Sequence, residues 1–149
     1  MNVSYTTIET DHHDLKPTFS REEISDFLKK ALEQYGDEKK AILKCIAYAY
    51  GDSEGQDGFI EVAHVEDQIV GVVIINDTNM GEYIPEHILV YIAVDPSTRG
   101  QGVGKELMKR VIQKTEGDIA LHVEPDNPAR FLYEKLGFTN KYLEMRLKK

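Results

Sequence analysis

The sequence contains a single cysteine, Cys45, among 149 residues, so no disulfide can form within the chain. A lone thiol is typical of proteins in a reducing compartment, and we therefore expect a cytoplasmic protein. No apolar run approaches the roughly 20 residues that a membrane-spanning helix requires, which argues against a membrane protein. The first residues, MNVSYTTIETDHH, carry neither a basic flank nor an apolar core, so a secretion signal is not expected.

Basic residues are also scarce, because 18 Lys and Arg stand against 26 Asp and Glu, a formal net charge of −8. Nucleic-acid binding draws much of its affinity from Lys and Arg against phosphates, so this charge argues against a nucleic-acid partner. No metal is expected, since His12 and His13 have no matching Cys/His partner and are interpreted as a solvated loop. The length suits one core and no linker is apparent, so residues 1–149 are predicted to form a single domain.

Hydrophobic periodicity predicts strands and helices along the whole chain. Ser20 and Glu23 form a capping-box pattern ahead of apolar residues at helical spacing, and Gly36 stands where such a helix would end. Consecutive early strands, followed by strands separated by helices, imply an α/β fold of the α+β kind: a mixed, mainly antiparallel sheet with helices on both faces. The predicted helices cover residues 20–36, 38–50, 102–115 and 127–137, and the predicted strands cover 2–9, 59–66, 67–77, 86–95, 118–125 and 138–147.

The stretch VDPSTRGQGVGKEL, residues 94–107, joins a predicted strand to a predicted helix through three glycines at alternate positions. A dinucleotide-binding fingerprint would need a third glycine at position 105, which is Lys105. A phosphate-binding P-loop would need a glycine at position 99, which is Arg99. A turn that merely starts a helix is a further alternative, although three glycines cost more chain entropy than such a turn needs.

This loop offers backbone N–H groups, from about Gln101 to Gly104, at the N-terminus of a helix. Such groups lack intrahelical acceptors, and the helix dipole favours an anion beside them. Arg99 precedes these donors, and Lys105, Lys109 and Arg110 follow them on the first helical turns. The loop therefore predicts a phosphate site that would suit a diphosphate.

Two motifs together resemble signatures of the GCN5-related N-acetyltransferase (GNAT) family. The first is Arg99-x-x-Gly102-x-Gly104, and the second is NPARFLYEKLGF at residues 127–138. The resemblance implies the acyl-CoA N-acyltransferase fold, with a splayed strand pair that receives the pantetheine arm of acetyl-CoA, and a loop that holds its pyrophosphate. The residues implied for the co-substrate are Ile92, Ala93, Val94, Arg99, Gly100, Gln101, Gly102, Val103, Gly104, Lys105, Asn127, Arg130 and Tyr133.

The resemblance also implies catalytic residues. It makes Tyr133 the acid that protonates the leaving thiolate, although a helix tyrosine packed against the sheet is the plainer interpretation. Asn127 is expected to cap the same helix. The general base is open between Glu86, at the start of a strand, and His122, whose imidazole needs little tuning to accept a proton at neutral pH. One common family version carries a carboxylate at the position of Ile88, so this sequence departs from it.

The expected function is transfer of an acetyl group from acetyl-CoA to a primary amine of a small molecule or peptide, by direct transfer in a ternary complex. Alternatives are a non-catalytic coenzyme A-binding regulatory domain and an acyltransferase for a longer acyl-CoA; a tyrosine at position 133 favours an enzyme. Cys45 is expected to be a small core residue rather than a nucleophile. The last segment, residues 137–149, is short, and we expect it either to open the acceptor side or to leave an edge for a homodimer.

Overall fold

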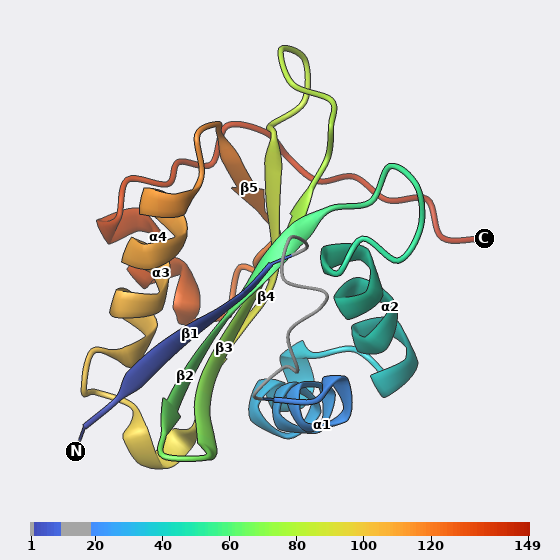
Figure 1. The fold of residues 1–149 in the computed structure, drawn as a ribbon. Coiled ribbons are helices and arrows are strands. Elements are labelled where there is room, and N and C mark those ends of the chain that lie inside the picture. The colour runs from blue at the N-terminus through green and yellow to red at the C-terminus, as the bar shows by residue number, and fades with distance from the viewer. Residues whose placement is uncertain (1, 10–18) are drawn as a thin grey trace.

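The structure is a computed structural model that describes residues 2–9 and 19–149 (Figure 1). One five-stranded sheet has the order β1-β2-β3-β4-β5. Strands β1 to β4 pair antiparallel with one another, and β5 pairs parallel with β4. The expected mixed, mainly antiparallel sheet is therefore confirmed. His12 and His13, predicted as a solvated loop, lie outside the described residues. The strands are β1 Ser4–Glu9, β2 Gly58–Val65, β3 Gln68–Asp77, β4 His87–Val94 and β5 Ile119–Leu121.

Helices cover both faces of the sheet, as the sequence predicts (Figure 1). Helices α1, Arg21–Leu32, and α2, Lys39–Ala49, lie on one face. Helices α3, Val103–Lys114, and α4, Ala129–Lys135, lie on the other. Each face therefore buries its own apolar cluster, one between the sheet and the first two helices and one between the sheet and the last two. Within the described ranges, no helix is both long and apolar enough to cross a bilayer.

Helix α1 starts as its sequence predicts. The Ser20 hydroxyl accepts a 3.0 Å hydrogen bond from the Glu23 N–H, and the Glu23 carboxylate accepts a 3.1 Å bond from the Ser20 N–H. These two bonds form the expected capping box. The α-helix ends earlier than predicted, at Leu32, and a 3-10 turn at Glu33–Tyr35 continues to Gly36, whose φ of −96° is not left-handed.

The β4 strand carries an irregularity where it passes the middle of the sheet. Ile74 of β3 pairs with Tyr91, but the next residue, Ile75, pairs with Leu89, so Val90 is an extra residue on β4. Such a bulge changes which face the following side chains take. The pairing of β4 with β5 covers only three residue pairs and stops at Leu89 and Leu121. Beyond them β4 continues without β5, which is the expected splay.

Two strand predictions are wrong, one in its extent and one entirely. The strand expected at 118–125 is formed only at 119–121, and residues 138–147, expected to be the last strand, form no strand. Both have the same physical cause, since a strand needs a neighbour to bond with. Residues 122–125 continue past the last β4–β5 pair, and residues 138–147 pair with no strand of the sheet.

Candidate active site

The connection from β4 to α3 is a short, self-bonded turn. The Asp95 carboxylate accepts hydrogen bonds from the N–H of Ser97, at 2.8 Å, and from its hydroxyl, at 2.7 Å. The hydrogen bonds from the Ser97 hydroxyl and N–H lower the pKa of Asp95. The 3-10 turn Pro96–Thr98 follows, and the buried Thr98 hydroxyl donates back to the Asp95 carbonyl at 3.0 Å. The turn therefore fixes where the glycine loop starts relative to β4.

The glycine loop contains two left-handed residues and leads directly into helix α3. Gly100 and Gly102 have φ values of 83° and 81°, in the left-handed region that side chains other than glycine rarely adopt. A Cβ added to either would have no heavy atom within 4 Å, so the loop presents open space. The bond from the Glu106 N–H to the Gly102 carbonyl, at 3.0 Å, opens helix α3. The preceding N–H groups, residues 103–105, thus have no intrahelical acceptor.

Gly104 lies where three elements approach one another, and a Cβ there would make ordinary van der Waals contacts. A Cβ at this position would lie 3.5 Å from Val94 Cγ2 on β4 and 3.7 Å from Leu132 Cδ2 on α4. The start of α3 therefore touches both the end of β4 and the residue next to Tyr133. Of the strand residues assigned to the co-substrate, Ile92 and Val94 pack on this face, whereas Ala93 packs on the α1 and α2 face.

The positive charges around the loop are fewer than the sequence suggests. Arg99, Gln101 and Lys105 are exposed beside the glycines. Arg110 instead pairs with Glu106, at 3.2 Å, and its guanidinium lies 4.2 Å from the centre of the Tyr5 ring. This cation thus faces β1, about two helical turns from Gly102.

Tyr133 is buried in the cluster between the sheet and the last two helices. Its ring contacts Phe138, with ring centres 5.9 Å apart. Its hydroxyl makes no hydrogen bond to any residue in the described part of the chain. Burial raises the pKa of Tyr133 to about 12. The phenol is therefore protonated at neutral pH and has its donor available.

The two other residues expected in this motif are engaged locally. Asn127 Oδ1 accepts a 2.9 Å hydrogen bond from the Ala129 N–H, so the asparagine caps the start of α4. Arg130 donates to Glu134 on the next turn, at 3.1 Å, and to the Pro125 carbonyl, at 3.2 Å. Its guanidinium therefore stabilises the link between β5 and α4.

The two candidate bases occupy different surroundings. Glu86 is exposed, just before β4, and its Oε1 accepts a 3.1 Å bond from the Asp118 N–H. Hydrogen bonds from its own backbone N–H and from that of Asp118 lower the pKa of Glu86. His122 is exposed and comes one residue after the end of β5, where the splay opens. Glu86 contacts the residue just before β5, whereas His122 follows the last β4–β5 pair, so the two candidate bases flank opposite ends of β5.

Cys45 is buried on α2, and its Sγ accepts a weak 3.5 Å bond from the Asn76 amide. Burial raises the pKa of the Cys45 thiol to about 12. The thiolate is therefore strongly disfavoured, in agreement with the expected core role. In the part of the chain that is described, no group of three or more His, Cys, Asp or Glu side chains could hold a metal ion.

Sequence reasoning missed one polar contact beside the splay. The Tyr91 hydroxyl donates a 2.5 Å hydrogen bond to Asp37 Oδ2, and burial, followed by this bond, raises the pKa of Tyr91. The bond ties the connection between α1 and α2 to β4, next to the bulge. No sequence pattern links two residues 54 positions apart.

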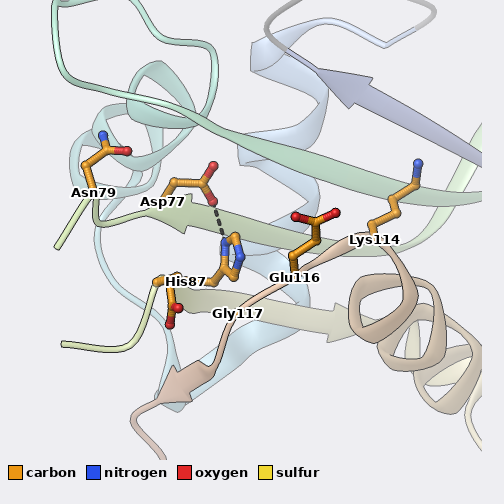
Figure 2. A pocket seen from close by; sticks show the side chains of 7 residues that line it. Asp77, Asn79, His87, Lys114, Glu116 and Gly117 are labelled. Atoms are coloured by element: carbon orange, nitrogen blue, oxygen red, sulfur yellow. Dashed lines mark hydrogen bonds and ion pairs between the residues drawn. The ribbon is translucent and has the colours of Figure 1, made fainter. Parts of the chain in front are cut away.

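A polar cavity of about 570 Å³ lies at the other end of β4 (Figure 2). His87 Nδ1 lies 2.7 Å from Asp77 Oδ1 there, and Lys114 comes from the last turn of α3. Because the glycine loop adjoins the first turn of α3, this cavity and the loop lie at opposite ends of that helix. The lining residues are Asp77, Asn79, Glu86, His87, Lys114, Glu116 and Gly117.

Comparison with known proteins agrees with the two motifs. The family model for the acetyltransferase (GNAT) domain matches residues 56–140. A 5-NmdU N-acetyltransferase of Pseudomonas phage PaMx11 is 34% identical over 84 residues, which are 55% of this chain and 58% of that protein. A ribosomal protein bS18-alanine N-acetyltransferase of Haemophilus influenzae is 32% identical over 100 residues, 62% of this chain and 65% of that protein. The chain thus spans less than two thirds of the length of these curated relatives.

The fold has solved counterparts. An aminoglycoside N-acetyltransferase, AAC(6')-Iy, in complex with CoA, has a TM-score of 0.69 with this chain, covering 99% of it and 95% of that chain. The sequence identity is 17%, so this likeness concerns the fold alone. It agrees with the expected acyl-CoA N-acyltransferase fold.

Proposed function

Because the chain belongs to the acetyltransferase (GNAT) domain family, we propose that it transfers an acetyl group from acetyl-CoA to a primary amine, by direct transfer in a ternary complex. One observation carries the proposal. Gly104 would meet Val94 and Leu132 with an added Cβ, so the glycine loop, the open part of β4 and the helix of Tyr133 adjoin one another. A phosphate cradle, a strand edge and a phenol donor are the parts that this reaction needs.

The residues present fit coenzyme A. The N–H groups at residues 103–105 and the two left-handed glycines would hold the diphosphate, with Arg99 and Lys105 adding positive charge. The open edge of β4 after Leu89, which includes Ile92, has backbone groups for the amides of the pantetheine arm. Bound acetyl-CoA supplies the reactive thioester, so the chain itself needs no nucleophile.

The reaction balances with one proton leaving the amine and one reaching the sulfur. The neutral amine nitrogen attacks the thioester carbonyl carbon, the C–N bond forms and the C–S bond breaks. The products are an acetamide and a thiol. Much of the rate can come from holding the two reactants together, because a thioester is already activated.

Tyr133 is proposed to act on the leaving sulfur as a hydrogen-bond donor. A full proton transfer from a phenol of pKa about 12 to a thiolate whose conjugate acid has a pKa of roughly 8.5 costs about 5 kcal/mol. A hydrogen bond to the developing thiolate avoids this cost while stabilising its charge. The proton on the sulfur then comes from solvent or from the amine.

We assign the base to His122 and a positioning role to Glu86. The carboxylate of Glu86 holds the start of β5 through Asp118, and its lowered pKa makes it a weaker proton acceptor. His122 stands at the opening of the splay and is exposed to solvent, so an imidazole there can take a proton from the amine and release it to water.

The acceptor is proposed only as a primary amine of a small molecule or a peptide. The printed names of the relatives, a 5-NmdU N-acetyltransferase and a ribosomal protein-alanine N-acetyltransferase, point to different acceptors. A reducing, cytoplasmic location is supported by the single buried thiol, Cys45.

A screen of amines that measures thiol release from acetyl-CoA tests the proposal. The panel should contain polyamines, amino acids, aminoglycosides, modified nucleosides and peptide N-termini. We expect at least one amine to raise thiol release well above hydrolysis, with the product heavier than the amine by one acetyl group. If the protein binds CoA but no amine raises its rate of thiol release, the non-catalytic alternative is favoured.

A further inference from the structure

The loop between β3 and β4, residues 78–86, presents apolar side chains to solvent. Figure 1 shows this loop projecting beyond the end of the sheet. Tyr83 is 75% exposed, and Met80 and Ile84 are 40% and 38% exposed. Large apolar side chains that gather on a surface mark an interaction site, and tyrosine is among the residues that contribute most to binding. We call these three side chains the apolar tip.

Hydrogen bonds hold this loop in one shape. The Thr78 hydroxyl donates to the Pro85 carbonyl at 2.8 Å and accepts from the Met80 N–H at 3.2 Å. The Ile84 N–H donates to the Met80 carbonyl at 3.1 Å. The apolar tip is therefore presented on a closed loop, so binding a partner orders little additional chain.

Acidic segments adjoin the loop. Asn79 Nδ2 donates a 2.9 Å hydrogen bond to the Gly55 carbonyl, so residues 51–58 lie beside it. The bond between Glu86 and the Asp118 N–H brings residues 115–118 to its base. Residues 51–58, 77–86 and 115–118 carry three, three and two Asp or Glu residues, and none of them is Lys or Arg. This end of the molecule is therefore strongly acidic.

Two cations adjoin these acids, and both are paired. Arg21 lies 2.6 Å from Asp52, and Lys114 lies 3.5 Å from Glu9. The polar cavity, which Lys114 also lines, opens among the same segments (Figure 2). Because the acids outnumber these cations, the potential at this end is negative and attracts a cationic partner.

Apolar side chains beside acids fit a polypeptide that carries both basic and apolar side chains. The same acids repel the phosphates of nucleic acid and the headgroups of an anionic membrane. A polyamine or an aminoglycoside would neutralise the acids, but it has no apolar side chain to cover Tyr83. A basic polypeptide is thus the partner that this surface suits.

The surface adjoins the opening of the splay. Strand β4 begins at His87, directly after the loop, and its pairing with β5 ends at Leu89. Two residues of extended strand span about 7 Å, so a peptide docked at the loop reaches the opening within a few residues. Ile88 lies between these two positions and is 37% exposed, so the apolar surface continues towards the splay.

We propose that the acceptor is a polypeptide, and that a basic segment near its reactive amine docks on residues 78–86 and the adjoining acids. This inference rests on the acetyl transfer proposed above and names its substrate class. The charges speed the encounter and lose effect in salt, whereas the apolar contacts slow dissociation. Contacts made away from the reacting atoms bind substrate and transition state alike, so their loss should raise KM rather than lower kcat.

Two peptides that differ only in charge test the proposal. Both have a free N-terminal alanine and alternating leucines, and one carries arginine wherever the other carries glutamate. Arginine has no primary amine, so the N-terminus is the single acceptor in each peptide. We expect kcat/KM to be at least tenfold higher for the arginine peptide in low salt, and this ratio to shrink in about 0.5 M NaCl. Equal values, or acetylation of small amines but of neither peptide, would overturn the proposal.

Variants of the loop have matched controls elsewhere in the chain. Tyr83→Ser should raise KM for the arginine peptide about tenfold, and Ile84→Ser should raise it as well, with kcat little changed. Ile112→Ser alters an isoleucine of α3 with a similar exposed fraction, 40%, and should not change KM. Glu82→Lys and Glu66→Lys reverse the charge of exposed, left-handed glutamates at opposite ends of β3, and only the first should raise KM. Wild-type KM in all the loop variants would overturn the proposal.

Fluorescence anisotropy of the arginine peptide, labelled at its C-terminus, separates this inference from the acetyl transfer. We expect its dissociation constant to change with KM across the variants. Binding that follows the variants, in a protein that acetylates no amine, would support the docking surface and contradict the acetyl transfer. Binding combined with acetylation of small amines alone would overturn the peptide as acceptor. Tighter binding of a DNA duplex, or of vesicles of phosphatidylcholine and phosphatidylserine, would also overturn the proposal.

Discussion

The Glu86 carboxylate accepts a hydrogen bond from the Asp118 N–H at 3.1 Å, and the bond joins the start of β4 to the start of β5. The adjacent His87 N–H donates to the Asp118 carbonyl at 3.0 Å, so both polar groups of one residue on the edge strand are held from β4. This pair of bonds fixes the two strands at the end where they meet. The splay therefore opens only at the other end, towards the glycine loop.

Glu86→Gln tests whether this carboxylate positions β5 or takes the proton. The amide oxygen of glutamine can still accept from Asp118, so we expect turnover to fall less than about tenfold. Loss of a general base would instead lower turnover by roughly 10² to 10⁴. Initial rates with the best amine of the panel decide between the two outcomes.

The same variant has a signature in the pH dependence of stability. The pKa of Glu86 is lowered in the folded protein, so its ionised form stabilises the fold above the pKa of an unfolded glutamate, about 4.3. This stabilisation is lost as the pH falls through the lower pKa of the folded state. We expect the melting temperature of Glu86→Gln to lie below that of wild type at pH 7 and the gap to close in acid. A gap that widens in acid would contradict the assigned direction.

His122→Gln should lower kcat by about 10² to 10⁴ if the imidazole is the base. An active base must be unprotonated, so the wild-type rate should rise with pH on the acid side, and the variant should lose that limb. Asp126→Asn, at another exposed position between β5 and α4, is a control for nonspecific effects on this loop. A variant profile that keeps the wild-type acid limb would remove His122 from the role.

Tyr133→Phe removes the hydroxyl and keeps the ring that packs against Phe138. We expect kcat to fall at least tenfold, while the dissociation constant of acetyl-CoA changes less than about threefold. Because the pKa of Tyr133 is raised to about 12, its ionisation should produce no limb in the wild-type rate below pH 9. Stopped-flow or steady-state rates between pH 6 and 9 check both statements, and an unchanged kcat would contradict the donor role.

Cys45 should resist alkylation in the folded protein. Burial raises the pKa of its thiol to about 12, and the thiolate is the form that reacts. We expect iodoacetamide at pH 8 to label the thiol in denaturant at least 100-fold faster than in buffer, with activity unaffected in buffer. Mass spectrometry counts the label, and rapid labelling of native protein would contradict the buried position.

Local sequence patterns predict most of the helices and strands. The wrong predictions concern segments whose structure depends on contacts with distant residues. The capping box at Ser20 and the glycine-rich turn that leads into α3 depend on neighbours in the chain, so the sequence reveals them. The bulge at Val90 and the contact of Asp37 with Tyr91 depend on distant residues, so no periodicity indicates them. The early end of β5 has the same origin, because its sequence favours a strand but β4 leaves it after Leu89.

Within the candidate site, the glycine loop also combines features that the local sequence predicts with features that depend on distant residues. Spacing alone predicted a phosphate cradle at Gly100, Gly102 and the start of α3. It did not show that Gly104 lies between Val94 and Leu132, nor that Arg110 turns away to Glu106. Those facts come from the side chains of other elements. The identity of the amine has no local pattern at all.

Isothermal titration with CoA tests the cradle most directly, using Gly102→Glu and a matched control, Gly55→Glu. Both glycines are left-handed, with φ values of 81° and 82°, and a Cβ on either meets nothing within 4 Å, so strain and space are equal. Only Gly102→Glu places a carboxylate beside the proposed diphosphate. We predict one-site binding by wild type and Gly55→Glu, and at least 100-fold weaker binding by folded Gly102→Glu. Equal affinity in all three proteins, or no binding by wild type, would contradict the cradle.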